Sequence, residues 1–325
     1  MSGSLHLGDF TSAANVYGAG GMPRYYGDAL VASAASDPRV VALGADLSAP
    51  TETDVIRDAM PDRFFMVGIQ EANLIGVASG MAKMGDIPFA NSFSVFLTRR
   101  CYDQIAMQVA YPKANVKLAG FLPGLSTLLG VSHQAIDDIA LMRALPNMTI
   151  IEPGGPDQIV PAVKAAIEID GPVYLRLQRA DRPLQKDQTL PPFELGKAQT
   201  LKDGADVAIV ASGLMIGQAR QAATKLSKRG ISTAVVNLHT IKPLDRNAIT
   251  QWARRCQLIV TAENHSIIGG LGSAVAEVLA EENAGARLVR VGLKDRFAEG
   301  GSLPYLLQKY RMSADAIVEA VVEAS

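Results

Sequence analysis

A glutamate stands at the start of a predicted helix, directly after a short strand. The run Arg63 to Val67 predicts a buried strand, and the apolar residues after Glu71 recur at the spacing of one helical face. A carboxylate in the first turn of a helix is favoured by the helix dipole. It would lie at the carboxyl end of a strand, where ligands of α/β sheets usually bind. Glu71 is therefore a candidate for hydrogen bonding or acid–base chemistry, and its position alone also fits a solvated charge.

The helix behind Glu71 carries a second face of very small residues. Ala72, Gly76 and Gly80 recur every fourth residue. Each glycine inside a helix costs about 1 kcal/mol relative to alanine. We therefore expect another backbone to come close to this face.

Two phenylalanines and a histidine follow further predicted strands. Phe93 and Phe96 are three residues apart, so a helical turn places their rings on one face. Two core phenylalanines are the default interpretation, and stacking on a flat heteroaromatic ligand is the alternative. His133 opens a helix after a glycine-bearing loop, and the near-neutral pKa of a histidine suits proton transfer. A structural histidine is the competing interpretation.

These side chains need a scaffold, and strands alternating with helices along the chain predict one. Such alternation favours α/β domains with mainly parallel sheets covered by helices on both faces. One helix is expected over 97–111. A proline-rich, charged stretch before residue 198 reads as a linker. The expected segments are a flexible tail at 1–20, an α/β domain at 21–182, a linker at 183–197 and a second α/β domain at 198–325.

The composition is that of an ordinary globular protein. Of 325 residues, 48% are hydrophobic and 19% charged, with a formal net charge of −1, so no basic excess supports binding to nucleic acid or anionic membranes. No apolar run approaches the roughly 20 residues that a membrane helix needs. No signal-peptide pattern is present, and Cys101 and Cys256 lie far apart without metal-ligand spacing. We expect a cytoplasmic protein with free thiols and no metal ligands of its own.

The motifs together resemble the transketolase family of thiamine-diphosphate enzymes. Gly68 to Asn73 with its small-residue helix, and Ser92 to Arg99, are similar to the family's pyrimidine-binding signature. Thr240 to Asp245 and Thr261 to His265 look like its C-terminal domain, where we assign no catalysis. The resemblance implies a pyrimidine-binding domain followed by a transketolase C-terminal domain.

The resemblance also implies roles for individual side chains toward thiamine diphosphate. The matching glutamate of the family hydrogen-bonds the aminopyrimidine ring, and paired aromatics stack on that ring. The segment Asp46-Leu47 matches one that reaches the cofactor across a dimer interface. The expected cofactor-binding residues are Asp46, Leu47, Glu71, Phe93, Phe96 and Arg99.

The substrate side departs from the family pattern. Gly130 to Gln134 resembles the element whose histidine faces the donor, which makes His133 a catalytic candidate beside Glu71, and Arg179 stands where the family has a phosphate-binding arginine. Phe121 replaces a substrate-binding histidine, and Leu129 replaces an acid that contacts sugar hydroxyls. Phosphate recognition depends on charge-assisted hydrogen bonds. We therefore expect a more apolar pocket, and an acceptor without phosphate or a 2-oxo acid as donor.

The chain lacks the family's Gly-Asp-Gly…Asn motif for the diphosphate and its Mg²⁺. This implies a separate N-terminal transketolase-like subunit as partner, in an α2β2 heterotetramer with a β–β contact. The preferred interpretation is the C-terminal subunit of a two-component enzyme. The enzyme would transfer a two-carbon ketol or acyl unit from a ketose or 2-oxo acid donor to an aldehyde or ketone acceptor. A carbanion on the cofactor would carry the transferred unit. The alternatives are a β-subunit of a 2-oxo acid dehydrogenase decarboxylase component and a catalytically silent scaffold or regulatory subunit.

Overall fold

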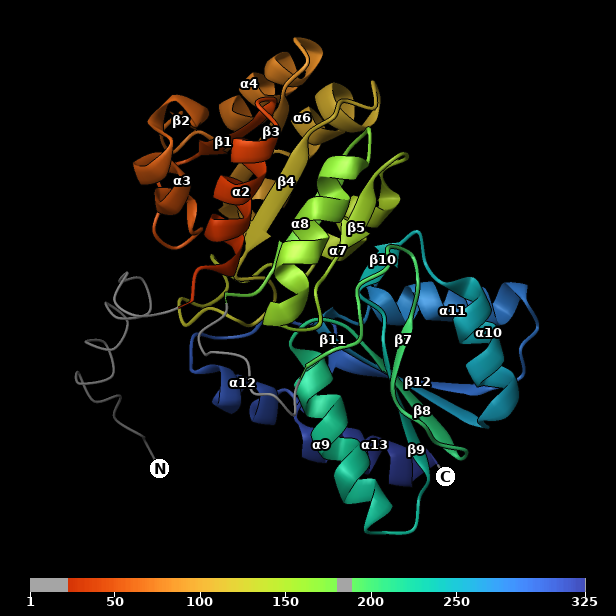
Figure 1. The fold of residues 1–325 in the computed structure, drawn as a ribbon. Coiled ribbons are helices and arrows are strands. Elements are labelled where there is room, and N and C mark those ends of the chain that lie inside the picture. The colour runs from red at the N-terminus through yellow and green to blue at the C-terminus, as the bar shows by residue number, and fades with distance from the viewer. Residues whose placement is uncertain (1–22, 180–188, 325) are drawn as a thin grey trace, which may run out of the picture.

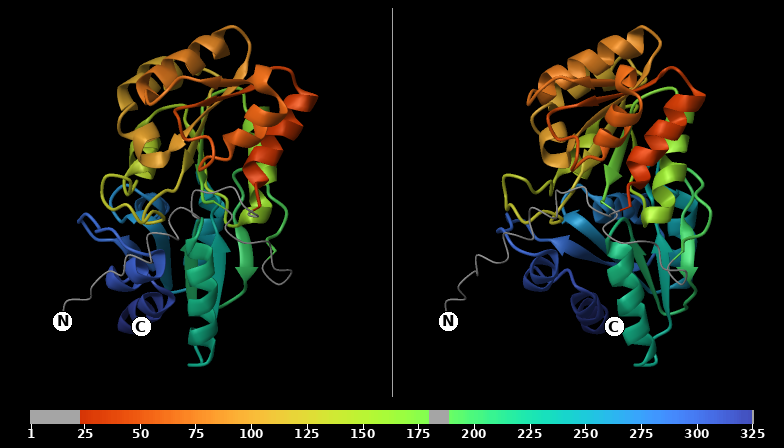
Figure 2. Two further views of the ribbon diagram at one scale, coloured as in Figure 1. Left: turned by 90° about the vertical axis from the view of Figure 1, so that its left-hand side faces the viewer. Right: turned by 60° about the vertical axis from the view of Figure 1, so that its left-hand side comes forward.

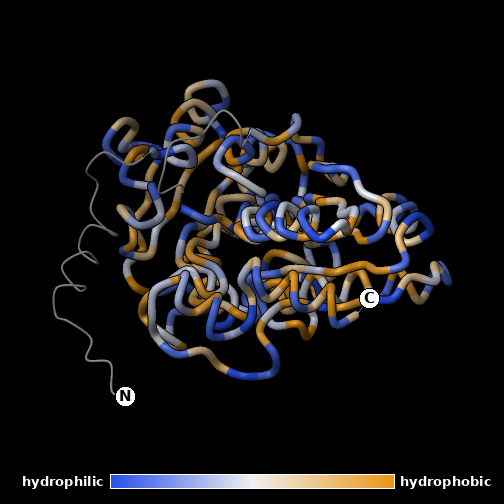
Figure 3. The backbone as a smooth tube through the Cα atoms, turned by 90° about the horizontal axis from the view of Figure 1, so that it is seen from below, coloured by the Kyte–Doolittle hydropathy of each residue, from blue (hydrophilic) through white to orange (hydrophobic). Residues whose placement is uncertain are grey.

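The computed structural model describes residues 23–179 and 189–324, which form two α/β units, one packed against an end of the other (Figures 1 and 2). Each unit has a mainly parallel sheet with helices on its faces, so the predicted fold class is confirmed. Hydrophobic stretches run through the interior of both units (Figure 3). The predicted tail at 1–20 and the first part of the predicted linker, 183–188, lie outside the described residues.

The sheet of the first unit has seven strands in the order β10-β5-β6-β4-β3-β1-β2. The six strands from this half of the chain run parallel, because helical crossovers return the chain to the same edge each time. The seventh strand, β10, comes from the second half and pairs antiparallel with β5. The strands are β1 (Val40–Gly44), β2 (Phe64–Met66), β3 (Ile87–Phe93), β4 (Lys117–Phe121), β5 (Thr149–Ile151), β6 (Val173–Leu177) and β10 (Thr240–Lys242).

One strand prediction was wrong about burial. The strand expected over 63–67 is present as β2, but it is the edge strand of the sheet and pairs only with β1. Phe65 is 39% exposed and Met66 45% exposed. A run of aromatic residues indicates a strand, but it does not show whether the strand has a neighbouring strand on both sides.

Helices cover both faces of this sheet. On one face α4 and a π-helical segment pack over the central strands, and on the other α2 packs against α8. The single helix expected over 97–111 is interrupted by a turn at residues 99–101, which separates a short α-helix from a second helical segment that changes from α to π geometry at residue 105. The helices are α2 (Tyr25–Ser36), α3 (Thr53–Ala59), η1 (Pro61–Arg63), α4 (Glu71–Lys83), α5 (Ser94–Thr98), α6 (Tyr102–Gln104), the π-helix η2 (Ile105–Ala110), α7 (Asp138–Ala144), η3 (Pro156–Gln158) and α8 (Ile159–Glu168).

The second unit has a five-stranded sheet in the order β12-β11-β8-β9-β7, in which only β7 runs antiparallel. The sequence analysis identified neither β7 nor the last two helices. The strands are β7 (Gln199–Lys202), β8 (Val207–Ala211), β9 (Thr233–Asn237), β11 (Leu258–Ser266) and β12 (Arg287–Leu293). The helices are α9 (Met215–Ser227), α10 (Arg246–Arg255), α11 (Leu271–Glu281), α12 (Leu303–Lys309) and α13 (Ala314–Ala324).

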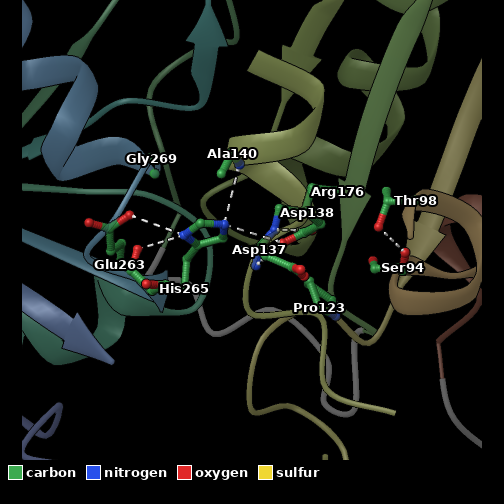
Figure 4. A network of polar contacts seen from close by, with 12 residues as sticks. Ser94, Thr98, Pro123, Asp137, Asp138, Ala140, Arg176, Glu263, His265 and Gly269 are labelled. Atoms are coloured by element: carbon green, nitrogen blue, oxygen red, sulfur yellow. Dashed lines mark hydrogen bonds and ion pairs between the residues drawn. The ribbon is translucent and has the colours of Figure 1, made fainter. Parts of the chain in front are cut away.

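A buried ionic network joins the two units at the carboxyl ends of their strands (Figure 4). Arg176 of β6 pairs with Asp138 at 2.7 Å and with Glu152 at 2.5 Å, and all three side chains are buried. Its remaining N–H donates to the backbone oxygen of Asn264 at 2.9 Å. Glu152 in turn accepts a 2.5 Å hydrogen bond from Ser212 of the second unit. One guanidinium therefore pairs with two carboxylates and connects both units.

The network continues into the second unit through a histidine and a second buried carboxyl group. In Figure 4 His265 lies between Glu263, 3.8 Å away, and Asp138, 3.9 Å away. Glu263 accepts the backbone N–H groups of Leu271 and Gly272 at the start of α11. Burial raises the pKa of Glu263 to about 8, so this carboxyl group retains its proton at neutral pH.

Removing the shared guanidinium should destabilise the chain strongly. Arg176→Met would leave Asp138 and Glu152 buried without their counter-charge, which typically costs about 3–5 kcal/mol. Urea unfolding measures the loss. Arg311→Met serves as the control, because Arg311 pairs with Glu319 and Glu323 on the surface and should change stability by less than about 0.5 kcal/mol. Equal effects of the two substitutions would contradict the assigned role.

Glu263 should make stability depend on pH. Its pKa in the folded chain is above its ordinary value, so its contribution is complete below about pH 4.5 and is lost as the pH rises toward about 8. Glu263→Gln resembles the protonated form and lacks this titration. The free energy of unfolding of the wild type, relative to that of Glu263→Gln, should therefore decrease from pH 5 to pH 8. Parallel pH profiles for the two proteins would show that Glu263 is not protonated in the fold.

Candidate active site

Glu71 opens α4 and is almost fully buried, with 1% of its side chain exposed. Its Oε1 lies 3.4 Å from the hydroxyl of Ser92, which donates to it from the end of β3. Its Oε2 accepts from an N–H of Arg100 at 2.6 Å. The interpretation of Glu71 as a solvated helix charge is therefore wrong, because the carboxylate is buried and is bonded to Ser92 and Arg100.

The two predicted aromatic rings lie beside each other at this crevice. Phe93 ends β3 and Phe96 follows on α5, with ring centroids 6.0 Å apart and planes inclined by 26°. The ring of His133 stands edge-on, with its centroid 5.1 Å from that of Phe96 and 6.3 Å from that of Phe93. The carboxyl ends of parallel strands share one edge of a sheet, which is why residues from separate segments meet here.

The loop that carries His133 is braced by its own backbone and by the second unit. Pro123 forms a β-bridge with Ala135, and α7 begins only at residue 138, so the expectation that His133 opens a helix was wrong. Gln134 donates to the backbone oxygen of Glu299 at 3.0 Å. Burial lowers the pKa of His133, so the ring is neutral at pH 7 and its Nδ1 lies 2.9 Å from the hydroxyl of Ser132. A neutral imidazole can accept or donate a proton near the aromatic pair.

The two consecutive arginines after Phe96 have different partners. Arg99, the predicted cofactor ligand, contacts both carboxylate oxygens of Asp137 at 2.8 Å and the backbone oxygen of Gln134 at 3.3 Å. It thus braces the His133 loop. Arg100, which the sequence analysis did not select, makes the contact with Glu71. The sequence offered two adjacent arginines after the aromatic pair as candidates for this contact. Only the turn at 99–101 determines that Arg100, and not Arg99, contacts Glu71.

The other predicted residues lie at the edges of this cluster or behind it. Asp46 is exposed at the end of β1, with its N–H directed at the sulfur of Met66, and Leu47 is half-buried. Phe121 is buried against Tyr26, with ring centroids 5.2 Å apart, so its side chain faces the core. Leu129 is 47% exposed on the loop that carries His133.

Arg179 lies in a separate cavity of about 140 Å³ at the junction of the two units. The described residues that line it come from the ends of β5 and β6 and from the start of α9, and Glu71, Phe93, Phe96 and His133 are not among them. The hydroxyl of Ser126 donates to Gln178, the neighbour of Arg179, at 3.0 Å, so the cavity adjoins the loop that leads to His133. The lining residues are Pro153, Gly154, Gly155, Pro156, Ile159, Gln178, Arg179, Gly213 and Leu214.

The Glu71 cluster fits a planar nitrogen heterocycle such as an aminopyrimidine. A buried carboxylate can hydrogen-bond a ring nitrogen, while the ring of Phe96 already carries the flat guanidinium of Arg100, 4.7 Å from its centroid. Over residues 23–179 and 189–324, no group of three histidine, cysteine or acidic side chains could hold a metal ion. Within the same ranges, no helix has the length and apolar character needed to cross a membrane.

Comparison with known proteins agrees with this geometry. The transketolase pyrimidine-binding domain matches residues 21–184, and the transketolase C-terminal domain matches residues 196–317. The chain belongs to the transketolase family. The resemblance inferred from the motifs around Glu71 and Phe93 is therefore confirmed.

Two relatives and one solved structure have about the length of this chain. It is 44% identical over 302 residues to the 6-deoxy-6-sulfo-D-fructose transketolase subunit SqwH of Clostridium sp. (strain MSTE9), covering 92% of this chain and 93% of that one. It is 39% identical over 305 residues to a putative transketolase C-terminal section of Methanocaldococcus jannaschii, covering 93% and 96%. A solved structure described as a split gene transketolase, inactive beta4 tetramer, shares 46% identity with a TM-score of 0.84, covering 93% and 97%.

Arg99 should hold the His133 loop rather than stabilise the whole chain. Because its ion pair with Asp137 is partly exposed, Arg99→Met should cost only about 0.5–1 kcal/mol in global stability. Backbone amides of residues 130–137 should nevertheless exchange hydrogen faster, because the loop loses three contacts. Arg57→Met, which removes a surface pair with Asp58, provides the control for nonspecific effects. Unchanged exchange in the loop would contradict the bracing role.

Proposed function

We propose that this chain is the C-terminal subunit of a two-component transketolase-like enzyme. It would transfer a two-carbon ketol or acyl unit from a ketose or 2-oxo acid donor to an aldehyde or ketone acceptor, with thiamine diphosphate as cofactor. The observation that carries this proposal is the buried carboxylate of Glu71 beside the Phe93–Phe96 pair, with the His133 ring at its edge.

Each side chain of the cluster has a distinct task in this proposal. Glu71 binds the ring nitrogen of the aminopyrimidine and exchanges a proton with it, while Phe93 and Phe96 hold the ring by stacking. His133, neutral because it is partly buried, moves a proton at the donor's oxygen atoms. When bound, thiamine diphosphate supplies the nucleophilic carbon that attacks the donor carbonyl. Asp46 and Leu47 contact the cofactor from the neighbouring protomer.

The diphosphate and Mg²⁺ would be held by a separate subunit. An octahedral magnesium needs carboxylate and diphosphate oxygens, and the described residues contain no cluster of three or more histidine, cysteine or acidic side chains that could hold it. The relatives support the arrangement, since one is described as a transketolase subunit and one as a C-terminal section. We propose an α2β2 heterotetramer in the cytoplasm, with a β–β contact and with domain boundaries at 21–182 and 198–325.

We expect a donor or acceptor with little negative charge. Phe121, at a position where the family binds substrate with histidine, faces the core and offers the substrate no charged donor, and Leu129 presents an exposed apolar side chain. Arg179 is then the main candidate for holding an acidic group on the substrate. The relative from Clostridium is named for a sulfonated ketose. A sulfonate carries one negative charge where a phosphate carries up to two, so a single arginine balances it better. Non-phosphorylated ketoses, sulfonated ketoses and 2-oxo acids are the donors to screen.

Calorimetric titration of thiamine diphosphate with Mg²⁺ tests the split active site. Binding should require the mixture of this chain with its N-terminal partner, and Glu71→Ala should weaken it about 10- to 150-fold, the loss typical of a charge-assisted hydrogen bond. Glu281→Ala, on the exposed face of α11, is the matched control. Tight binding to the lone chain would contradict the proposed division of the cofactor site. No binding in the mixture would favour the scaffold alternative.

Donor screening with the assembled enzyme separates the substrate classes. Release of the shortened aldehyde from sulfonated or non-phosphorylated ketoses should exceed release from xylulose 5-phosphate. Acyl transfer to a lipoyl domain would instead support the alternative of a decarboxylase β-subunit. Full activity with xylulose 5-phosphate and ribose 5-phosphate would refute the apolar-pocket prediction.

A further inference from the structure

The closest charged partner of Glu71 reaches it from the surface. The guanidinium of Arg100 bonds Oε2 of Glu71 at 2.6 Å, and its carbon lies 4.7 Å from the centroid of Phe96. The side chain of Glu71 is 1% exposed, whereas that of Arg100 is 49% exposed. A buried carboxylate is thus neutralised by an arginine that remains half in solvent.

These two contacts are those that the proposed function assigns to the cofactor ring. A guanidinium is flat, donates N–H groups in its plane and packs on aromatic faces, as a protonated aminopyrimidine does. Ser92 donates to Oε1 of Glu71, and Arg100 donates to Oε2 while its guanidinium also lies over the ring of Phe96. A pyrimidine ring that bonds Oε2 and stacks on this face of Phe96 would have to take the place of the guanidinium.

We propose that Arg100 gates the pyrimidine site by occupying the place of the ring on Glu71 and Phe96, and that it must swing outward before thiamine diphosphate can bind. This inference rests on the proposed function. Burial of an unpaired carboxylate is costly, so Arg100 keeps Glu71 compatible with its pocket until a ring nitrogen replaces the guanidinium.

The local structure lets the side chain move without unfolding its support. Arg100 lies in the turn between α5 and α6, and its neighbour Arg99 is anchored to Asp137 on the His133 loop. Rotation of one half-exposed side chain is therefore enough to open the site. Only molecules in which Arg100 is away from Glu71 can bind the cofactor. The apparent affinity is therefore the intrinsic affinity multiplied by the fraction of molecules in that state.

A gate has a signature that a cofactor ligand or a purely structural arginine lacks. Arg100→Met keeps the aliphatic stem but removes the bond to Glu71. It should lower the melting temperature of the lone chain by about 2–4 °C, because Glu71 loses its counter-charge. It should also tighten binding of thiamine diphosphate with Mg²⁺ to the assembled enzyme about tenfold, as expected for a site that is otherwise open one-tenth of the time. Stability and affinity thus change in opposite directions.

The experiment measures both quantities for the wild type, Arg100→Met, Glu71→Gln and the double variant, with Arg57→Met as a surface control. Thermal unfolding of the lone chain requires no cofactor, and there the effect of Arg100→Met should vanish when Glu71 is already Gln. Weaker cofactor binding by Arg100→Met would overturn the gate and make Arg100 a ligand. Unchanged binding by Arg100→Met, with normal binding by the wild type, would overturn the gate alone. Failure of both assemblies to bind the cofactor would overturn the proposed function and the gate together.

Discussion

The buried guanidinium of Arg176 holds the site and the two units together. It balances Asp138 of the first unit and Glu152, which Ser212 of the second unit also contacts, and it bonds the backbone of Asn264. Neither carboxylate would tolerate burial without it. One side chain of β6 therefore links the two units, alongside the pairing of β10 with β5 and the bond from Gln134 to Glu299.

The network around Arg176 helps to position the residues of the candidate active site. Asp138, fixed by Arg176, begins α7, and the preceding residue Asp137 receives Arg99. Arg99 holds the loop that presents His133 to Phe96, and Gln134 ties the same loop to the second unit through Glu299. The buried Arg176 network and the partly exposed Arg99–Asp137 pair thus brace the site. Arg100, one residue away and half exposed, is the part that can move.

Arg176 and Arg100 differ in burial, and this difference assigns Arg176 to the stability of the fold and Arg100 to the control of cofactor binding. Arg176 is fully buried, and its loss would leave two acids unpaired, whereas Arg100 neutralises a single acid from the surface. Evenly packed cores tolerate few alternative side-chain positions, but a half-exposed side chain retains several rotamers. A ligand that offers Glu71 an equivalent hydrogen bond can therefore replace Arg100 without disturbing the fold.

The sequence by itself determined the α/β class, most strand positions and the identity of Glu71, Phe93, Phe96 and His133 as a group. Phe93 ends a strand, and the other three lie in segments that follow the carboxyl ends of strands, which a parallel sheet brings to one edge whatever the remaining contacts are. Their local pattern was enough to place them, and the agreement with the family matches followed from the same short motifs.

Tertiary structure alone decided which partners these residues have. It turned Arg99 toward Asp137 and Arg100 toward Glu71, placed Phe121 in the core, left β2 at an edge and added β10 from the second unit to the first sheet. Adjacent residues of one type are equivalent in a sequence, and only a turn in the backbone distinguishes them. Burial and ion pairing depend on segments far apart in the chain, so no local pattern could have predicted the network around Arg176.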